Sequence, residues 1–394
     1  MTSDKKIGII IGCLNLGGAE KTAALLSRQL SNNGYDVYIF IDRHSGGTAF
    51  KYLGKIVWMS SIETGDFERN LKYRAYYLEN LKREIGIDVS ISFMEPYNFM
   101  NMMSDIGDKK LVSVRTFLSS RRQEQPKLDN IYKKKIPKLY NKASYVVTMT
   151  EAQEEDLVTN YVVNRDKVAI IPNTIDENNN VNDDNCSPEI KLSRHSIVNI
   201  GRLIDVKAQW QLIRAMQKVL DIVPDVQVYF LGSGENLTML TNLAESLDVS
   251  EHIHFEGFSS DVGFYLKQAD ILVHVSRAEG FVNALLDAFA NGTPVICTDV
   301  KSSPRELLAP GTRQKDIFTE PEYAEYGVLV PAPDIDKKNF SKELTTGENI
   351  LADAIIRILT DDEIREHYQK KSKERAMDFT ADKITAKWIN LIEA

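Results

Sequence analysis

Two carboxylates and two cations are the residues of this sequence whose types and spacing could do chemistry. Glu279 and Asp287 lie eight residues apart in SRAEGFVNALLDAFANGTPVICTD. Arg202 and Lys207 lie five residues apart in NIGRLIDVKAQWQLIRAM. Such carboxylates accept hydrogen bonds from the hydroxyls of a ribose or a hexose, whereas Arg binds a diphosphate as a fork and Lys as a point charge. By themselves, both pairs are also compatible with charged residues on a solvated surface.

The predicted elements around the carboxylates place them at the end of a strand. An apolar strand that ends at Ser276 leads into a loop with Glu279, and a helix is expected over 283–291 with Gly292 as its stop. Asp287 is then about two turns from Glu279, roughly along one side. The helix N-terminus beside the carboxylates offers N–H groups to a phosphate.

Glycine-bearing turns at other strand ends also lead into helices, whose N-termini could bind an anion. Arg202 and Lys207 follow a strand that ends at Gly201, on a loop that enters a helix. In GCLNLGGAEK, Gly17 and Gly18 let the backbone approach a ligand closely, and the helix that follows favours anions. This loop lacks the G-x-G-x-x-G dinucleotide pattern. Both GCLNLGGAEK and the similar LGSGENLTML are compatible with plain connecting turns.

The order of predicted elements indicates two α/β domains. A chain of 394 residues with 43% hydrophobic content is too long for one ordinary core. Short apolar strands alternate with helices, the rhythm breaks at the polar stretch 176–195, and it then restarts, as expected for two parallel sheets with helices on both faces. The tail 379–394 has apolar residues at helical spacing, namely Ile384, Trp388, Ile389 and Ile392. The strands are expected at 6–12, 36–42, 87–93, 110–115 and 144–149, and at 196–202, 227–234, 253–257, 271–276 and 294–299.

The composition excludes several classes of protein. The formal net charge of −8 does not suit a general nucleic-acid binder. The N-terminus leads straight into a strand rather than a signal peptide, and no run of about 18 apolar residues occurs, so we expect a cytoplasmic protein. The three scattered cysteines, Cys13, Cys186 and Cys297, form no C-x-x-C pair and are expected to be reduced.

No metal-binding pattern is found among the acids and histidines of the sequence. Asp183 and Asp184 lie in the polar stretch between the domains, and Asp361 and Asp362 have the pattern of a helix start. We therefore predict no metal site. The histidines expected to be structural or on the surface are His44, His252 and His254.

The sequence resembles the retaining glycosyltransferases of family 4, which have the GT-B fold. The strings that carry the resemblance are GRL…K…LI.A, LG.G, IHFEGFS.DV..YL..AD and S..EGF.NALLDA.A.GTPVI.TD..SSPRELL, in this order. They cover about 196–310, and the likeness extends to the GGAEK loop and the closing helix. The resemblance implies two Rossmann-like doubly wound domains that face each other across a cleft. The C-terminal helix would return to the N-terminal domain.

This resemblance assigns a role to each domain and to the residues of the motifs. Residues 1–180 with the helix at 379–394 would bind the acceptor, 181–195 would be the linker, and 196–378 would bind the donor. The family's motif is usually Glu, seven residues, Glu, so Glu279 would contact donor-sugar hydroxyls. Asp287 would contact the ribose with a shorter side chain than the usual Glu. The other residues implied are Arg202 and Lys207 for the diphosphate, the backbone of Gly280, Phe281 and Val282 for the sugar or phosphate, and Gly257, Phe258, Pro172 and Asn173 beside the base.

A basic segment at 109–142 is the main candidate for contact with the acceptor or a membrane. Its cations outnumber its acids, Glu124 and Asp129, and apolar residues lie among them, which suits an anionic membrane face and a lipid diphosphate. A solvated basic helix is the alternative. Many family members use a His near the sugar in this domain, and Arg115 stands where that His is expected. The cations are Lys109, Lys110, Arg115, Arg121, Arg122, Lys127, Lys133, Lys134, Lys135, Lys138 and Lys142.

We therefore expect a metal-independent retaining hexosyltransferase without a cofactor. It would move a hexose or N-acetylhexosamine from a nucleoside diphosphate sugar, with UDP favoured, to a glycan acceptor on a lipid carrier in surface polysaccharide assembly. It would be cytoplasmic or peripheral on the inner face of the cell membrane. Two alternatives are a UDP-sugar epimerase on the same fold and a catalytically silent glycosyltransferase-like partner subunit.

Overall fold

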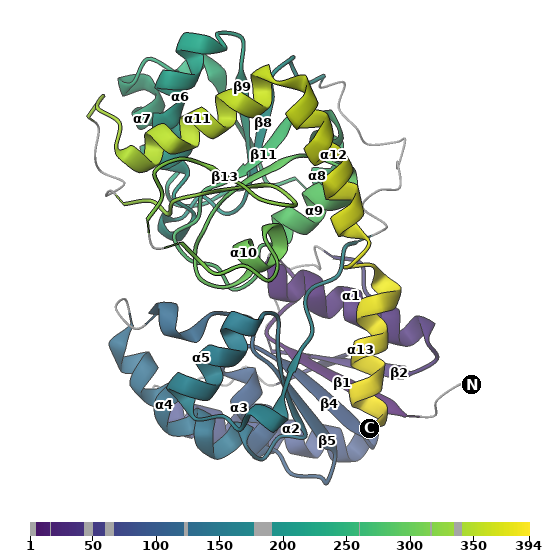
Figure 1. Ribbon diagram of the computed structural model, residues 1–394. Coiled ribbons are helices and arrows are strands. Elements are labelled where there is room, and N and C mark those ends of the chain that lie inside the picture. Colours follow the sequence, from purple (N-terminus) through teal and green to yellow (C-terminus); the bar gives the residue numbers. More distant parts are fainter. Residues whose placement is uncertain are drawn as a thin grey trace. The chain divides into compact units, whose positions relative to one another are not determined.

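The computed structural model describes the chain in two compact units (Figure 1). Unit 1 comprises 1–174 and 381–394, and unit 2 comprises 175–380. Most of the predicted linker, together with His44, Arg122, Glu124, Asp183, Asp184 and Cys186, lies outside the described residues. The described residues are 5–15, 17–42, 50–59, 67–121, 125–176, 191–259, 261–315, 317–334 and 341–394.

The described strands of unit 1 form a seven-stranded parallel sheet in the order β3-β2-β1-β4-β5-β6-β7. The five predicted strands of this unit are confirmed to within two residues. β3 and β7 are strands that the sequence did not indicate. The bounds are β1 Lys6–Ile11, β2 Asp36–Ile41, β3 Lys55–Trp58, β4 Val89–Phe93, β5 Lys109–Ser113, β6 Tyr145–Thr148 and β7 Val168–Ile170.

Helices cover this sheet, and the last helix of the chain is one of them. As predicted, α13 returns to unit 1, where it packs beside α1 (Figure 1). Its buried face includes Ile384, Trp388 and Ile392, and the Trp388 ring lies 6.3 Å from that of Phe93 in β4. The helices of unit 1 are α1 Gly18–Asn32, α2 Phe67–Ile85, α3 Tyr97–Met103, α4 Pro126–Tyr140, α5 Glu151–Tyr161 and α13 Ala381–Glu393, with 3-10 turns η1 Leu118–Arg121 and η2 Arg165–Lys167.

The described strands of unit 2 form a second seven-stranded sheet, in the order β10-β9-β8-β11-β12-β14-β13. All its pairs are parallel except β13 with β14. The predicted helix after Glu279 is confirmed as α9, which Gly292 ends in the left-handed conformation. The strands are β8 Ser196–Ile200, β9 Gln227–Leu231, β10 Ile253–Gly257, β11 Ile271–His274, β12 Val295–Thr298, β13 Glu322–Tyr323 and β14 Val328–Val330.

The helices of unit 2 lie on both faces of its sheet. Asp361 accepts a hydrogen bond from the backbone N of Ile364 and so caps α12, which confirms the predicted helix start. The helices are α6 Gln209–Ile222, α7 Leu237–Ser246, α8 Val262–Gln268, α9 Asn283–Asn291, α10 Ser303–Leu308, α11 Thr346–Thr360 and α12 Asp362–Ala376, with 3-10 turns η4 Asp205–Lys207 and η5 Ser250–His252.

Both sheets reverse their strand order beside the first strand of the unit. In unit 2 the reversal lies between β8 and β11, and in unit 1 it lies between β1 and β4. Open α/β sheets bind ligands outside the carboxyl ends of their strands at such a point. The loops that follow β8 and β11 carry Arg202, Lys207 and Glu279.

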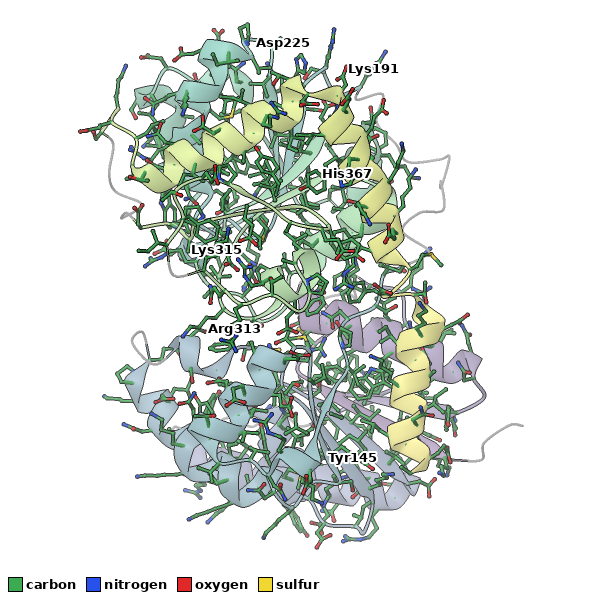
Figure 2. All side chains as sticks on the ribbon, viewed as in Figure 1. Tyr145, Lys191, Asp225, Arg313, Lys315 and His367 are labelled. Carbon is green, nitrogen blue, oxygen red and sulfur yellow. The ribbon has the colours of Figure 1, made fainter. Side chains whose placement is uncertain are left out.

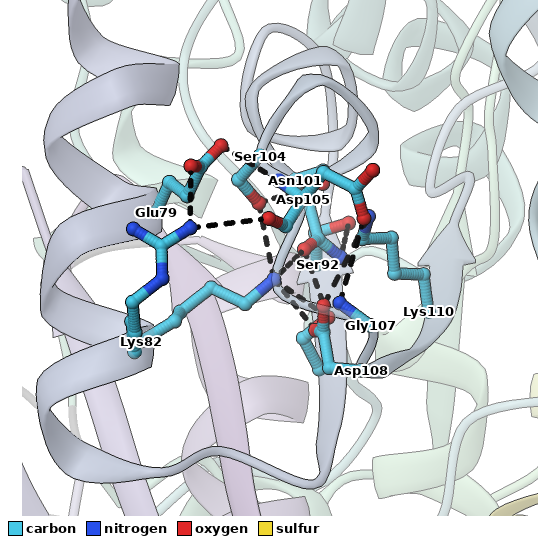
Figure 3. Close-up of polar contacts among 11 residues, drawn as sticks. Glu79, Lys82, Ser92, Asn101, Ser104, Asp105, Gly107, Asp108 and Lys110 are labelled. Carbon is cyan, nitrogen blue, oxygen red and sulfur yellow. Dashed lines mark hydrogen bonds and ion pairs between the residues drawn. The ribbon is translucent and has the colours of Figure 1, made fainter.

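A buried polar cluster lies at the opposite, amino-terminal edge of the unit 1 sheet (Figure 3). Lys82 Nζ lies 2.6 Å from Asp108 Oδ2, and both side chains are fully buried. Asn101 and Ser104 also accept hydrogen bonds from this ammonium, at 3.1 and 3.0 Å. Burial lowers the pKa of Lys82 to about 8, although Asp108 opposes that change. The cluster therefore joins α2, α3 and the start of β5 away from the candidate site.

The described histidines expected to be structural or on the surface make hydrogen-bond contacts, and the described cysteines are unpaired with each other. His252 Nδ1 lies 2.9 Å from the carbonyl oxygen of Val226, and His254 Nε2 lies 2.7 Å from Gln227 Oε1. Among the described cysteines, Cys13 and Cys297 are both free thiols. The two histidines therefore join η5 and β10 to the start of β9 in unit 2.

Candidate active site

Glu279 is a buried carboxylate held by two nitrogen donors. Its side chain is 8% exposed. Lys207 Nζ lies 2.6 Å from Oε1 of Glu279, and His274 Nε2 lies 2.7 Å from the same oxygen. The structure therefore brings together two of the three residues predicted to be catalytic, which are 72 positions apart in the sequence.

The surroundings of Glu279 keep its carboxyl group ionised. Burial by itself raises the pKa of this group, but the charge of Lys207 and the hydrogen bond from His274 outweigh burial. The net effect holds the pKa of Glu279 well below its usual range. An ionised carboxylate accepts hydrogen bonds and donates none, so its remaining capacity suits the hydroxyls of a ligand.

His274 and Ser276 are site residues that the sequence reasoning missed. Both are buried at the end of β11, and Ser276 Oγ lies 2.9 Å from His274 Nε2. Burial lowers the pKa of His274, against the effect of Glu279. The signal was present in ILVHVS, because two polar residues at alternate positions of an apolar strand project from the same face.

Backbone hydrogen bonds fix the loop that carries Arg202 and Lys207. Leu203 N donates to Ser233 O at 3.0 Å, and Arg277 N donates to Val206 O at 2.8 Å. The second bond ties this loop to the loop that carries Glu279. Arg202 itself is exposed at the end of β8, where its guanidinium is accessible to a ligand.

The glycines of LGSGENLTML pack against this same loop. A Cβ at Gly232 would lie 2.1 Å from the carbonyl oxygen of Gly201, and a Cβ at Gly234 would lie 2.3 Å from that of Leu203. Such separations are impossible, so both positions require glycine. The turn after β9 therefore braces the cation-bearing loop.

The loop from Gly280 to Val282 is anchored at the start of α10. Val282 N donates to Ser303 Oγ at 2.9 Å, and the Ser302 hydroxyl donates to Gly280 O. Phe281 is half-buried against the core of unit 2. The first turn of α9 contains no acid, so its N–H groups remain suited to an anion.

The residues predicted to contact the ribose and the base lie in unit 2, on α9 and at the end of β10. They are Asp287, Gly257 and Phe258. Asp287 is half-buried in the second turn of α9. Gly257 has φ of 73° at the end of β10, and a Cβ there would meet no atom within 4 Å. The Phe258 side chain is 52% exposed and is available to cover a planar group.

The remaining predicted site residues lie together in unit 1, at the carboxyl edge of its sheet. Arg115 donates hydrogen bonds to Asn173 Oδ1 and to Thr22 Oγ1, and Thr22 is the fifth residue of α1. The Thr22 hydroxyl donates to Gly18 O at 2.8 Å. A Cβ at Gly17 would lie 2.2 Å from a carboxylate oxygen of Glu20, which occupies the start of α1.

Arg115 differs from the other buried cations of the described chain. Lys82, Arg214 and Arg305 each pair with a buried carboxylate at 2.6 Å or less. Within the described residues, Arg115 hydrogen-bonds only to neutral side-chain oxygens, and its Nε has no partner. Burial lowers the pKa of Arg115 to about 9. The site therefore has a buried positive charge that an anionic ligand would neutralise.

Comparison with known families decides what kind of protein has this fold and site. The family model described as "Glycosyl transferases group 1" matches residues 183–375, and the model "Glycosyltransferase Family 4" matches 16–179. The chain belongs to the family 4 glycosyltransferases. Its fold and its enzyme class, a transferase, follow from this membership.

Curated relatives include glycosyltransferases from bacteria and archaea. This glycosyltransferase is 27% identical, over 96% of its length and 97% of the relative's, to a Campylobacter jejuni enzyme. That enzyme is named N-acetylgalactosamine-N,N'-diacetylbacillosaminyl-diphospho-undecaprenol 4-alpha-N-acetylgalactosaminyltransferase. The present chain is also 30% identical to an uncharacterized glycosyltransferase of Methanocaldococcus jannaschii, over 64% of each chain.

Solved structures show the same GT-B fold. Sucrose-phosphate synthase of Thermosynechococcus elongatus has a TM-score of 0.80 at 18% identity and covers 99% of this chain and 98% of that one. Anabaena HepE in complex with UDP and glucose has a TM-score of 0.75 at 15% identity, with 99% of both chains covered. These likenesses show the two-domain GT-B architecture.

The basic segment of this glycosyltransferase does not form one exposed face. Arg115 is 7% exposed, and Lys109 Nζ lies 5.6 Å from the centre of the Tyr145 ring. Tyr145 is labelled among the side chains of Figure 2. On α4, Lys133 pairs with an acid of its own helix and Lys135 pairs with an acid of α2. The exposed lysines of α4 are Lys127, Lys133, Lys134 and Lys138.

Two features are absent from the part of the chain that the structure describes. No cluster of three or more histidine, cysteine, aspartate or glutamate side chains suited to a metal was found in that part of the chain. None of the helices described there is long and apolar enough to cross a membrane.

Proposed function

We propose that this family 4 glycosyltransferase moves a hexose or N-acetylhexosamine from a UDP-sugar to a glycan acceptor on a lipid diphosphate, with retention of configuration. The acceptor would belong to the assembly of a surface polysaccharide or glycoconjugate. The observation that carries the proposal is the buried, ionised Glu279, held by Lys207 at the carboxyl end of β11.

The donor would bind in unit 2. Arg202 is exposed and Lys207 Nζ lies beside Glu279, so a diphosphate between the two cations would place the sugar next to the carboxylate. The backbone of 280–282 and the start of α9 would contact the phosphate or sugar. Asp287 would accept a hydrogen bond from the ribose. The base would lie against Gly257 and Phe258.

The chemistry requires stabilisation of the leaving diphosphate. The acceptor oxygen forms a bond to the anomeric carbon while the bond from that carbon to the phosphate oxygen breaks. The acceptor's proton passes to the departing phosphate on the same face. Arg202, Lys207 and the α9 N-terminus would offset the negative charge that develops, and we propose that no metal ion or cofactor is needed.

The acceptor would bind in unit 1 through its phosphate groups. Arg115 has no carboxylate partner among the described residues, and it lies beside the start of α1 with Gly17 and Gly18. The Campylobacter jejuni relative acts, by its name, on a diphospho-undecaprenol acceptor. A lipid diphosphate would supply the anion that Arg115 lacks.

Peripheral contact with an anionic membrane would fit such an acceptor. Each Lys near such a surface contributes on the order of 1 kcal/mol. Replacing the exposed Lys127, Lys134 and Lys138 with Ser should therefore reduce flotation with anionic vesicles, and added salt should release the wild type. Wild-type protein that never floats would remove membrane contact from the proposal.

Incubation with a panel of UDP-sugars tests the proposed reaction. Transfer to a lipid-diphosphate glycan, or slow hydrolysis without acceptor, is the expected result. Formation of a 2-epimer would instead identify a UDP-sugar epimerase, and no turnover with any donor would favour a silent partner subunit.

A further inference from the structure

His274 is the second donor to Glu279, and its protonation follows from its partners. The side chain is 3% exposed, with Nε2 at 2.7 Å from Glu279 Oε1. Since an ionised carboxylate only accepts hydrogen bonds, Nε2 must carry a hydrogen. Nδ1 is buried and has no hydrogen-bond partner in the described structure. A bare Nδ1 costs less there than an unpaired N–H, so the ring is neutral with its hydrogen on Nε2.

We propose that His274 is a positioning residue for the transfer reaction. Its Nε2–H holds Oε1 of Glu279, so that Oε2 stays directed at the donor sugar while Lys207 binds the diphosphate. This role rests on the proposed function, because it concerns the carboxylate assigned there to the sugar hydroxyls. Nothing in the family resemblance or the comparisons assigns a role to His274.

The need for a second donor follows from the position of Lys207. Lys207 and His274 both contact Oε1, and Oε2 makes no hydrogen bond within the described residues. The Lys207 ammonium, with 20% of its side chain exposed, is the donor that a diphosphate would attract. A buried carboxylate that loses its cation is costly unless another donor remains. His274 is fixed in β11 opposite Cys297 of β12, so it stays in place.

Filling of the core does not account for this residue. The other residues of β11 are apolar and fully buried, and a histidine there leaves Nδ1 without a partner. A leucine would fill comparable space without that cost. The hydrogen bond to Glu279 is what the imidazole adds.

Three substitutions of His274 separate positioning from packing. In His274→Gln, the amide nitrogen reaches roughly the place of Nε2 and keeps a donor for Glu279. His274→Asn is too short to do so, and His274→Leu has no donor. We expect His274→Gln to keep kcat within about 5-fold of wild type. The His274→Asn and His274→Leu variants should lose roughly 10–100-fold in kcat, which is the size of effect seen when a residue that orients a functional group is removed. Their KM for the UDP-sugar should change little.

The pH profile gives a readout that packing would not change. His274 lowers the pKa of Glu279, so its loss raises that pKa and moves the acidic limb of kcat/KM to higher pH in His274→Leu but not in His274→Gln. The positioning role would be overturned if the loss of kcat in the three variants were proportional to their loss of thermal midpoint. It would also be overturned if His274→Leu kept the wild-type kcat and the wild-type pH profile of kcat/KM.

A stability measurement distinguishes this failure from failure of the proposed function. No turnover by the wild type with any nucleotide sugar would overturn the proposed function. The hydrogen bond from His274 to Glu279 is tested without catalysis by measuring the free energy of unfolding of wild type and of Glu279→Gln across pH. A depressed pKa stabilises the fold above the unfolded value of about 4.3, and this contribution is lost as pH falls. The Glu279-dependent stability that is lost as pH falls should be smaller when His274 is replaced by Leu. An equal loss with and without His274 would contradict the proposed hydrogen bond to Glu279.

Discussion

Replacing Gly234 with Ala should impair donor binding, although Gly234 is exposed and has no side chain. A Cβ at this position would lie 2.3, 2.7 and 2.8 Å from the O, C and N atoms of Leu203. Ordinary contact begins at 3.4 Å, so the loop must move by about 1.1 Å, which is 3.4 minus 2.3. Because all three atoms are backbone, rotation of a side chain cannot relieve the overlap.

The size of the effect follows from what this movement displaces. Leu203 adjoins Arg202, and its loop is held by hydrogen bonds from Leu203 N to Ser233 O at 3.0 Å and from Asn236 N to Leu203 O at 2.9 Å. Weakening both bonds should cost about 1–3 kcal/mol of unfolding free energy. Misplacing a charged contact by about 1 Å should lower turnover by roughly 10²-fold.

Calorimetry with UDP and turnover of the UDP-sugar are the assays, and Ser233→Ala is the matched control. Ser233 is an exposed neighbour in the same turn, and its substitution leaves the backbone contacts unchanged. Gly234→Ala should bind UDP more weakly than the control and turn over more slowly. Equal affinity and turnover in the two variants would refute the view that this turn braces the diphosphate loop.

Three further predictions concern the donor site and the framework. Arg202→Ala should lose about 10²-fold or more in turnover with an unchanged thermal midpoint, because it removes a contact to the leaving diphosphate; near wild-type turnover would argue against this contact. Asp287→Ala should weaken UDP binding in calorimetry, whereas Glu279→Gln should mainly reduce turnover; unchanged UDP affinity in Asp287→Ala would remove its ribose role. Lys82→Met should cost about 3–5 kcal/mol in denaturant unfolding because it removes the nearer of the two cations beside the buried Asp108 carboxylate and leaves only Lys110, at 3.9 Å; an added Asp108→Leu should recover part of this loss.

The sequence predicted the fold where hydrophobic pattern and turn signals agree. The buried strand Lys6–Ile11 is apolar and followed by glycine, and Gly292 ends α9 as expected. Lys55–Trp58 has only four residues and an exposed lysine, so it has too little pattern to be recognised. Val168–Ile170 has three residues and becomes a strand only because it pairs with β6.

The candidate site was predictable in its charged residues and not in their partners. Spacing and resemblance indicated Glu279 and Lys207, but no local pattern shows that a salt bridge joins residues 72 positions apart. His274 was missed because one histidine in an apolar strand is usually structural. Arg115 was expected near the substrate, but its missing counter-charge is visible only when its neighbours are known.

The most direct test of the central claim is the reaction itself, measured with UDP-sugars and a lipid-diphosphate glycan in the presence of a chelator. We predict release of UDP from one hexose or N-acetylhexosamine donor, an α-linked product from an α-linked donor, and a loss of about 10²-fold or more in Lys207→Ala. A product of inverted configuration, a reaction abolished by the chelator, or equal rates in wild type and Lys207→Ala would contradict the proposed roles of Glu279 and the two cations.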